Sequence, residues 1–418
     1  MLSQVDAADL TAGVTLPWGV WRVDALHHVA LPGEWSPVIC AMTGAAALSP
    51  AEIDDALGRP IGAEPIERIA AGARKVAIAI DDLTRPTPTA LMLPHVLRRL
   101  QRAGVAHDCV TVIVATGAHR WPVDSDLELK VGGVRRHVAV IAHDPAGDLV
   151  DTGEKLGGIP VRLNRTFMES DVRIGMCGVI PHPFAAFSGG GKIVIPGLAS
   201  LDVLARTHKF ALMGFKGGHQ LDGNRFRTEM EEVVRRTGLQ WTVNVAINGR
   251  REPVGVTAGD LVAAHRAAVK VAERTGATAP PAQPLDALVL NAYPKDGELL
   301  QIEAAFVALR SGMMKWLRPG APIVLTASCV DGLGHHGLFG PGGLLFRTPG
   351  PKTFLADHAL LVYTPGVDSD AFATAFWCGY RHFRLWTGLV EHLQTLIPRS
   401  ASIGVVPCGP LQLATERP

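Results

Sequence analysis

The sequence predicts an α/β protein with two domains, each built on a mainly parallel sheet. Continuous apolar runs bounded by charged or turn residues recur along the chain, as expected of strands that are buried on both faces. Helical patterns separate these runs, and polar clusters follow several of them directly, which is typical of a doubly wound sheet. The chain has 418 residues, more than one core ordinarily supports, so a second domain is expected.

The first half of the chain contains the clearest strand signal. Residues 75–80, KVAIAI, form a continuous apolar run, and Pro86 and Pro88 prevent the strand from continuing. A helix is expected next, over residues 89–103. Further segments of strand character are residues 109–115, 137–142, 171–177 and 242–248, with a strand pair expected around 20–29. Helical patterns cover residues 50–57 and 257–274.

The best linker candidate is the segment 276–284, GATAPPAQP, which is rich in proline and alanine and carries no charge. It separates an N-terminal domain, residues 1–275, from a C-terminal domain, residues 285–418. Beyond it the alternation restarts, with strands expected at 286–292, 322–328, 359–364 and 402–407, and helices near 299–311, 351–358 and from 369. We expect the active site in the cleft between the two domains.

The composition excludes several classes of protein. Hydrophobic residues make up 47% and charged residues 19% of the chain, which is ordinary for a globular enzyme and excludes a disordered one. The formal net charge of +1 gives no field that would recruit nucleic acid or anionic lipid. We find no signal peptide and no apolar run long enough to span a bilayer, and the six cysteines are scattered. A cytoplasmic enzyme without nucleic-acid or membrane partners is expected; the residues do not set its oligomeric state.

The stretch 182–208 carries the most chemistry in the chain. It begins at His182 and reaches His208, and between them Lys192 directly follows a small polar turn, Ser188-Gly189-Gly190-Gly191. Three glycines expose backbone N–H groups, and such a turn can bind an anion beside the lysine ammonium. This is not a Walker A loop, because Ile193 stands where that motif requires serine or threonine. A flexible turn with a solvated lysine is the alternative.

Further candidate residues follow the expected strands. Asp82 and Arg85 come after the first strand and His119 after the second, and ligands of open parallel sheets bind beyond these carboxyl ends. Arg85 could clamp a carboxylate through two hydrogen bonds. Asp82 could orient the Arg85 side chain or a ribose hydroxyl. His119 and His182 are candidate general acids and bases, because imidazole titrates near neutral pH. A turn salt bridge and structural histidines are the alternatives.

Taken together, these segments resemble the nickel-dependent lactate racemase family of 2-hydroxyacid racemases and epimerases. The matching segments cover both expected domains in order, and the segment at residues 182–197 is long and specific. They are DDLTRPTP (81–88), TGAHR (116–120), HPFAAFSGGGKIVIPG (182–197), THK (207–209) and YPKDGELLQ (293–301).

The resemblance implies a nickel pincer nucleotide, a pyridinium-3-thioamide-5-thiocarboxylic acid mononucleotide whose sulfur and carbon atoms ligate nickel. By position, Lys192 would be tethered to it through a thioamide and His208 would ligate the nickel. Other proteins would be needed to synthesise this cofactor. The remaining residues expected near the cofactor are Asp82, Thr84, Ser188, Gly189, Gly190 and Gly191.

The resemblance also implies the catalytic residues. The acid/base pair maps to His119 and His182, the arginine that binds the substrate carboxylate maps to Arg85, and Gln301 matches a glutamine of the active site. The family's lactate racemases carry a lysine three residues after that glutamine, where this chain has Ala304. Alanine at this position removes a cation and frees volume, so we expect a larger 2-hydroxy acid rather than lactate alone as the small-molecule substrate. Lys295 could replace the lost charge and favour a second carboxylate, as in malate.

Two alternatives from other functional classes stay open. One is a nickel-free enzyme that binds a nucleotide or phosphate at the glycine run, such as a dehydrogenase or transferase. The chain lacks the Walker A motif that a phosphate-binding enzyme of this kind would favour. The other is a non-catalytic protein that binds a small acid, which would need Arg85 but neither both histidines nor Lys192.

Overall fold

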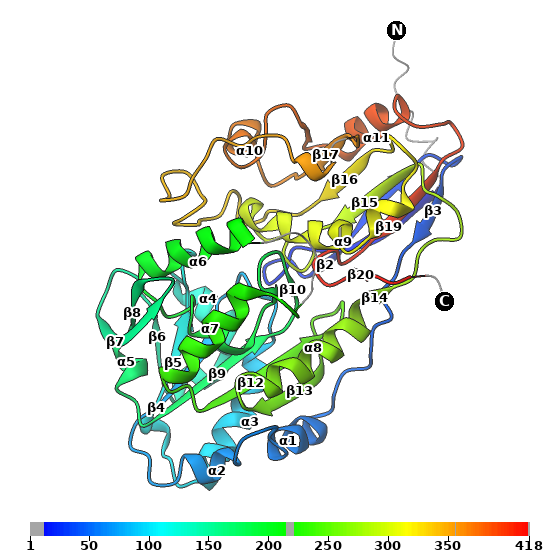
Figure 1. The fold of residues 1–418 in the computed structure, drawn as a ribbon. Coiled ribbons are helices and arrows are strands. Elements are labelled where there is room, and N and C mark those ends of the chain that lie inside the picture. Colours follow the sequence, from blue (N-terminus) through cyan, green and yellow to red (C-terminus); the bar gives the residue numbers. More distant parts are fainter. Residues whose placement is uncertain (1–11, 215–220, 356, 417–418) are drawn as a thin grey trace. The chain divides into compact units, whose positions relative to one another are not determined.

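The computed structural model describes residues 12–214, 221–355 and 357–416, and they form two compact units (Figure 1). Unit 2 is Gly44–Thr275, and unit 1 combines Met1–Thr43 with Gly276–Pro418. The chain passes from unit 2 to unit 1 at Gly276, the first residue of the expected linker. The chain before residue 44 differs from the expectation, because it groups with the C-terminal residues rather than with the N-terminal domain.

Unit 2 is built on one mainly parallel sheet with the strand order β13-β12-β9-β4-β5-β6. All its neighbouring strands are parallel except β12 and β13. The strands are β4 (Val76–Asp81), β5 (Val110–Ala115), β6 (Ala139–Ala142), β9 (Val172–Gly178), β12 (Trp241–Ile247) and β13 (Pro253–Gly259). The order reverses between β4 and β9, because the chain first builds outward through β5 and β6 and then returns to the other side of β4. Ligands of doubly wound sheets bind at such a switch point.

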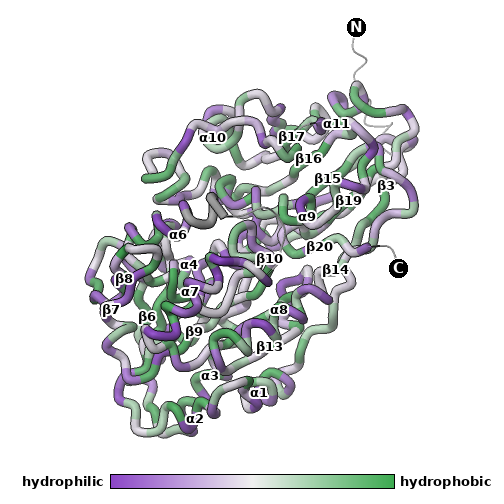
Figure 2. The backbone as a smooth tube through the Cα atoms, viewed as in Figure 1, coloured by the Kyte–Doolittle hydropathy of each residue, from purple (hydrophilic) through white to green (hydrophobic). Residues whose placement is uncertain are grey.

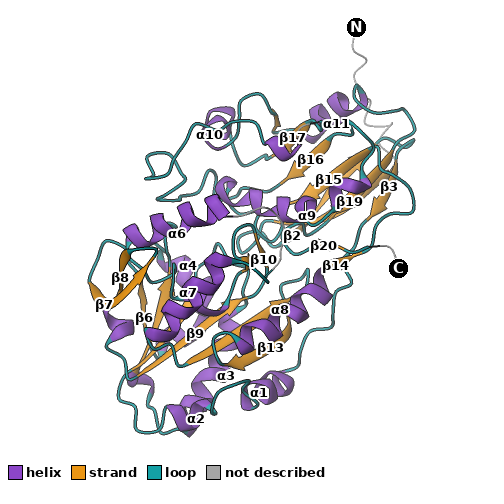
Figure 3. Ribbon diagram, viewed as in Figure 1, coloured by secondary structure: helices purple, strands orange, loops and turns teal. Residues whose placement is uncertain are grey.

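The strands of unit 2 form where the sequence predicts them, because every residue of β4 is buried and neighbouring strands are also apolar. One face of the sheet packs against η4 (Gly190–Ile193) and α7 (Arg225–Arg236), which lies across the strands in Figure 3. The expected helix over 257–274 differs at its start. Its first residues complete β13, and the helix α8 begins only at Ala263.

The other elements of unit 2 are short strands, helices and turns. The strands are β7 (Leu149–Leu156) paired with β8 (Ile159–Asn164), and β10 (Pro181–His182) paired with β11 (Ala186–Phe187). The helices and turns are α1 (Pro50–Gly58), α2 (Ile66–Ile69), α3 (Thr89–Arg102), η2 (His107–Cys109), α4 (Asp124–Val131), η3 (Gly132–Arg136), α5 (Arg165–Met168), α6 (Leu201–Gly214) and α8 (Ala263–Gly276).

Unit 1 has a parallel sheet with the order β18-β17-β16-β15-β19-β3. Its strands are β3 (Ser36–Ile39), β15 (Ala287–Asn291), β16 (Ile323–Thr326), β17 (Leu360–Tyr363), β18 (Arg381–Phe383) and β19 (Ser402–Val406). Hydrophobic residues run along β15 and β16 (Figure 2), and all are buried. The order reverses between β15 and β19, so the loop after β15 lies at the switch point of this sheet.

Pairing of β3 with β19 explains why the chain before residue 44 belongs to unit 1. The antiparallel pair β1 (Ala12–Trp18) and β2 (Ala25–Leu31) adds apolar residues to the same core. Within the expected linker, β14 (Ala277–Thr278) pairs with β20 (Leu413–Ala414), so part of that segment is ordered strand. These contacts join residues distant in sequence, which periodicity does not reveal.

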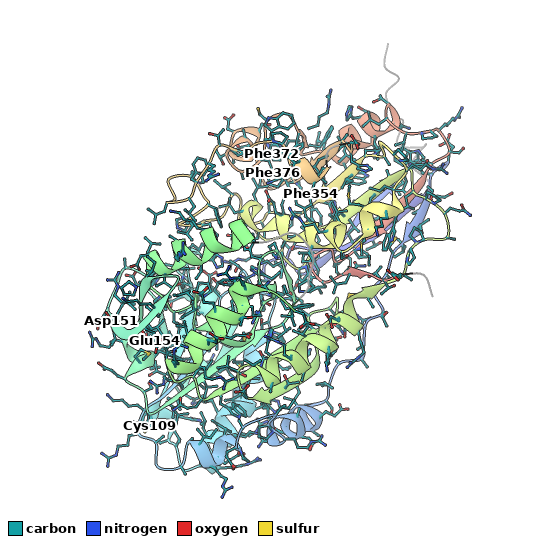
Figure 4. The ribbon with its side chains drawn as sticks, in the orientation of Figure 1. Cys109, Asp151, Glu154, Phe354, Phe372 and Phe376 are labelled. Atoms are coloured by element: carbon teal, nitrogen blue, oxygen red, sulfur yellow. The ribbon has the colours of Figure 1, made fainter. Side chains whose placement is uncertain are left out.

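The helices of unit 1 are shorter than expected. The segment near 299–311 is divided into η5 (Leu299–Ala305) and α9 (Phe306–Arg310), and within 351–358 the structure describes η7 (Thr353–Leu355). Stacked Phe372 and Phe376, with ring centroids 5.3 Å apart, fix the helix expected from residue 369 in the core (Figure 4). The remaining helices and turns are η6 (Met313–Trp316), α10 (Ser369–Ala375) and α11 (Trp386–Gln394). Among the described residues, no helix has the length and apolarity needed to cross a membrane.

Candidate active site

The candidate site lies at the switch point of the unit 2 sheet. Three chain segments leave the carboxyl ends of adjacent strands there: the loop after β4, the loop after β5, and the chain from the end of β9 to η4. They carry Asp82 and Arg85, His119, and His182 with Lys192. Of these side chains, those of Asp82 and His119 are joined by a direct hydrogen bond.

Asp82 and His119 form a directly bonded pair. His119 Nδ1–H donates to Asp82 Oδ2 at 2.6 Å, and the other carboxylate oxygen accepts the Thr84 N–H at 3.0 Å and hydroxyl at 2.6 Å. Burial alone would raise the pKa of Asp82, but the charge and hydrogen bond of His119, with Thr84 and Arg85, hold it far below its usual range. Asp82 is thus an ionised carboxylate that orients His119 and leaves the lone pair on Nε2.

His182 is held in the opposite sense. It ends the short strand β10, and its Nδ1 accepts the backbone N–H groups of Phe184 at 3.2 Å and Ala185 at 3.3 Å. An acceptor Nδ1 places the proton of the neutral ring on Nε2. His182 is therefore presented as a donor, whereas His119 is presented as an acceptor.

Lys192 and Arg85 are half-buried, and within the described part of the chain no hydrogen bond or salt bridge joins the Lys192 amine or the Arg85 guanidinium to another side chain. Burial, followed by the charges of Arg85 and Arg227, lowers the pKa of Lys192 well below its ordinary value. A lowered pKa makes the amine of a lysine easier to deprotonate, and the deprotonated amine is the nucleophilic form. Arg85 remains available for an anion, as a clamp for a carboxylate requires.

His208 lies on α6, and its Nδ1–H donates to the Leu204 carbonyl at 2.8 Å. This bond leaves the lone pair of the neutral ring on Nε2, the arrangement that metal-ligating histidines use. Desolvation lowers the pKa of His208 to about 4, and the charges of Lys192, His119 and Arg85 act in the same direction. The Phe184 ring lies between His182 and His208, with centroid distances of 5.5 and 6.3 Å.

The Ser-Gly-Gly-Gly turn differs from an open anion cradle. The Ser188 hydroxyl donates to the Gly178 carbonyl at 2.7 Å, and the Gly190 N–H donates to Asn244 Oδ1 at 2.9 Å. A Cβ at Gly189 would lie 2.6 Å from the Val179 side chain. The glycines of this turn accordingly allow close packing inside the protein, where the sequence suggested room for a ligand.

The other expected site residues lie in unit 1, after β15. Lys295 is 2% exposed, and Gln301 and Ala304 lie half-buried on η5. Beside Ala304, Glu303 forms a salt bridge of 2.5 Å with Lys352. The structure thus places these residues at the switch point of the unit 1 sheet, as a separate group from the residues of unit 2.

Comparison with known proteins finds similarity to lactate racemases. Residues 27–218 match the family model of the lactate racemase N-terminal domain. A lactate racemase of Lactiplantibacillus plantarum is 28% identical over 316 residues, covering 74% of this chain and 72% of that protein. A lactate racemase of Thermoanaerobacterium thermosaccharolyticum is 26% identical over 293 residues, covering 68% of this chain and 67% of that protein. This chain is therefore similar to lactate racemases over more than two thirds of its length.

Solved structures support the fold of this chain. The lactate racemase apoprotein of T. thermosaccharolyticum superposes with a TM-score of 0.73 at 22% identity, covering 97% of this chain and 100% of that one. A protein from Thermotoga maritima superposes with a TM-score of 0.65 at 19% sequence identity, covering 89% of this chain and 99% of that one. The two sequence relatives are racemases, a class of isomerase.

The residues of unit 2 fit the cofactor that this family implies. Lys192 offers an amine with a lowered pKa for a covalent tether, and His208 offers an oriented nitrogen lone pair for nickel. Within the described part of the chain, no group of three or more His, Cys, Asp or Glu side chains could hold a metal ion.

Two buried cations of the site were missed by reasoning from the sequence. Lys130 of α4 forms a 2.6 Å salt bridge with Asp81 and donates to the Arg85 carbonyl at 3.1 Å. Arg227 of α7 contacts the chain between His182 and Lys192. Each lies on a helix of mixed composition, where a charged residue is ordinarily solvated, and only the spacing of Arg227 and Glu231 hinted at a pair.

Proposed function

We propose that this chain interconverts the stereoisomers of a 2-hydroxy acid by reversible hydride transfer, using a nickel pincer nucleotide tethered at Lys192 and ligated by His208. The observation that carries the proposal is the amine of Lys192, which has a strongly lowered pKa beside the Asp82–His119 pair and the Arg85 guanidinium. When bound, the cofactor supplies the acceptor for the C2 hydride.

The residues of the chain supply binding and proton transfer. Arg85 binds the substrate carboxylate through paired hydrogen bonds. His119 accepts the hydroxyl proton at Nε2, and Asp82 stabilises the imidazolium that forms. His182 lies across from it in the proposed complex, and the two rings exchange roles for the opposite stereoisomer. Two proton-transfer groups suit a racemase, because the hydroxyl group of each enantiomer approaches from a different side.

The substrate is proposed to be malate or a larger 2-hydroxy acid, with lactate a poor substrate or one of several. Ala304 stands in place of the lysine of the family's lactate racemases, and Lys352 is engaged by Glu303. Lys295 is proposed to supply the replacement charge and Gln301 a polar contact. A buried cation of this kind favours a second carboxylate on the substrate.

A substrate panel tests the proposal. Protein co-produced with the enzymes of cofactor synthesis is incubated with single enantiomers of lactate, malate and longer 2-hydroxy acids, and products are resolved by chiral chromatography. We expect malate or a longer acid to have a higher kcat/KM than lactate, with equal values from both enantiomers because their free energies are equal. Racemisation of lactate alone would remove the proposed specificity, and no turnover by nickel-loaded protein would remove the racemase reaction.

A further inference from the structure

The chain between His182 and Lys192 is clamped by one buried arginine. Arg227 is 1% exposed, and its Nε donates to the Ala185 carbonyl at 3.0 Å. Both terminal nitrogens reach the Gly189 carbonyl at 3.4 Å, and Nη2 also donates to the Phe187 carbonyl. One guanidinium thus fixes three carbonyls on alternate residues of this short segment.

The clamp is itself held by a charged network. Glu231, one helical turn after Arg227, accepts its Nη1 at 2.8 Å and binds Arg266 of α8 through contacts of 2.8 and 2.6 Å. His265 donates from Nε2 to the Ser188 carbonyl at 2.8 Å. The network therefore fixes four carbonyls, those of Ala185, Phe187, Ser188 and Gly189.

The opposite side of the turn is closed as well. Asn244 accepts the Gly190 N–H, and a Cβ at Gly190 would lie 3.0 Å from the His265 ring. Lys192 follows directly on η4, with its N–H 3.4 Å from the Gly189 carbonyl that Arg227 also contacts. The position of Arg227 is consequently transmitted to Lys192 through one shared carbonyl.

We propose that Arg227 is a positioning residue, which clamps the 185–189 backbone and thereby fixes the Lys192 amine for attachment of its cofactor. This inference rests on the proposed function of Lys192. A guanidinium is required because its planar fork reaches several carbonyls at once, and a lysine ammonium in its place has neither the reach nor the geometry. The charge of Arg227 also contributes to the lowered pKa of Lys192, after burial and Arg85.

The test compares Arg227→Lys with wild type, each co-produced with the cofactor's synthetic enzymes. Peptide mass spectrometry measures the fraction of Lys192 carrying the cofactor mass. We expect Arg227→Lys, which keeps the charge, to lower that fraction about tenfold or more. The matched control is Arg236→Gln on the same helix, which breaks only a surface salt bridge with Glu154 and is expected to load normally.

A second readout uses the proteins without cofactor. An amine-reactive ester labels Lys192, and exposed Lys155 in the same molecule is the internal reference. We expect Arg227→Lys to change the Lys192 rate relative to Lys155 about threefold or more, together with faster hydrogen exchange over residues 185–192. Normal loading, labelling and exchange in Arg227→Lys would overturn the inference.

Two further outcomes are distinguishable. If wild type carries no cofactor while a control racemase loads in the same host, the proposed function fails, and labelling and exchange still decide the role of Arg227. If Arg227→Lys does not fold, Arg266→Gln replaces it, because this half-buried residue supports the clamp indirectly, through Glu231 and His265. Wild-type rates of hydrogen exchange over residues 185–192 in that variant would overturn the proposal that Arg227 clamps this segment, and faster exchange would support it.

Discussion

At the scale of single residues, identical side chains of this site are set to different tasks by their hydrogen bonds. His119 donates from Nδ1 to a carboxylate, His182 accepts at Nδ1 from two backbone N–H groups, and His208 donates from Nδ1 to a carbonyl. These bonds fix which ring nitrogen carries the proton. The Nε2 lone pair of His119 suits its proposed role as proton acceptor, and the Nε2–H of His182 suits a hydrogen-bond donor. The Nε2 lone pair of His208 suits its proposed role as metal ligand.

The first prediction concerns the Asp82–His119 pair. Asp82→Asn is expected to lower kcat roughly 10²- to 10⁴-fold, because the imidazolium of His119 loses its counter-charge and its orientation. The fall in kcat/KM must be equal for both enantiomers of the substrate. Initial rates from each enantiomer, measured across a pH series, provide the check.

A matched control for this prediction exists elsewhere in unit 2. Asp54 and His95 form a pair with the same 2.6 Å separation, on α1 and α3. Asp54→Asn is expected to leave kcat within about twofold, because this pair lies outside the proposed site. Equal losses in the two variants would show that a general structural effect, rather than proton transfer, explains the result.

Much of the site at this scale could be predicted, but not the partners of its side chains. Position after a strand and the family resemblance indicated Asp82, Arg85, His119 and Lys192. Asp82 was expected to orient Arg85 or a ribose hydroxyl, whereas it bonds His119. Sequence places residues at strand ends but does not give the side-chain rotamers that decide which of them meet.

At the scale of elements, the loop after β4 is held by a buried ion pair. Lys130→Met is expected to destabilise the protein by about 3–5 kcal/mol, because it leaves the Asp81 carboxylate buried without its cation. Urea unfolding measures the loss, and adding Asp81→Asn should recover part of it. Arg135→Gln, which breaks an exposed pair with Asp124, is expected to cost less than about 1 kcal/mol. Similar small losses in both single variants would contradict the structural role of Lys130.

The glycine turn gives a prediction about pH. Burial, then the charge of Arg227, holds the pKa of His265 well below its usual value, while Glu231 and Arg266 complete its charged surroundings. As pH falls through about 6.5, the unfolded chain therefore binds a proton that the folded chain does not, and stability falls. His265→Gln is expected to remove at most about 2 kcal/mol of this loss between pH 7.5 and 5.

Urea unfolding at several pH values checks this prediction. Wild type should lose more stability than His265→Gln on acidification, whatever their difference at pH 7.5. His28→Gln, an exposed histidine of unit 1, is the control and should follow wild type. Parallel curves for wild type and His265→Gln would exclude a contribution from His265.

Elements were predicted best where burial alone determines them. The continuous apolar run at 75–80 becomes β4 within one residue at each end. The helical pattern at 257–274 failed at its start, because apolar residues of β13 and α8 follow one another without a clear break. Near 299–311 the chain begins as a 3₁₀ helix, a distinction that hydrophobic periodicity does not resolve.

At the scale of the whole molecule, non-local pairing determines the two units. β3 is added to the unit 1 sheet beside β19, near the other end of the chain. Alternation of strands and helices predicts the class of each sheet, but register between distant strands depends on contacts that no local pattern contains. The doubly wound class was therefore predictable, and the membership of residues 12–43 was not.

The central claim is a nickel cofactor tethered to Lys192, and peptide mass spectrometry with metal analysis tests it most directly. Protein is co-produced with the enzymes of cofactor synthesis, beside Lys192→Ala and a control racemase. The account predicts the cofactor mass on the peptide containing Lys192, stoichiometric nickel, and loss of both in Lys192→Ala. An unmodified Lys192 without nickel, in a host where the control racemase loads normally, would contradict it.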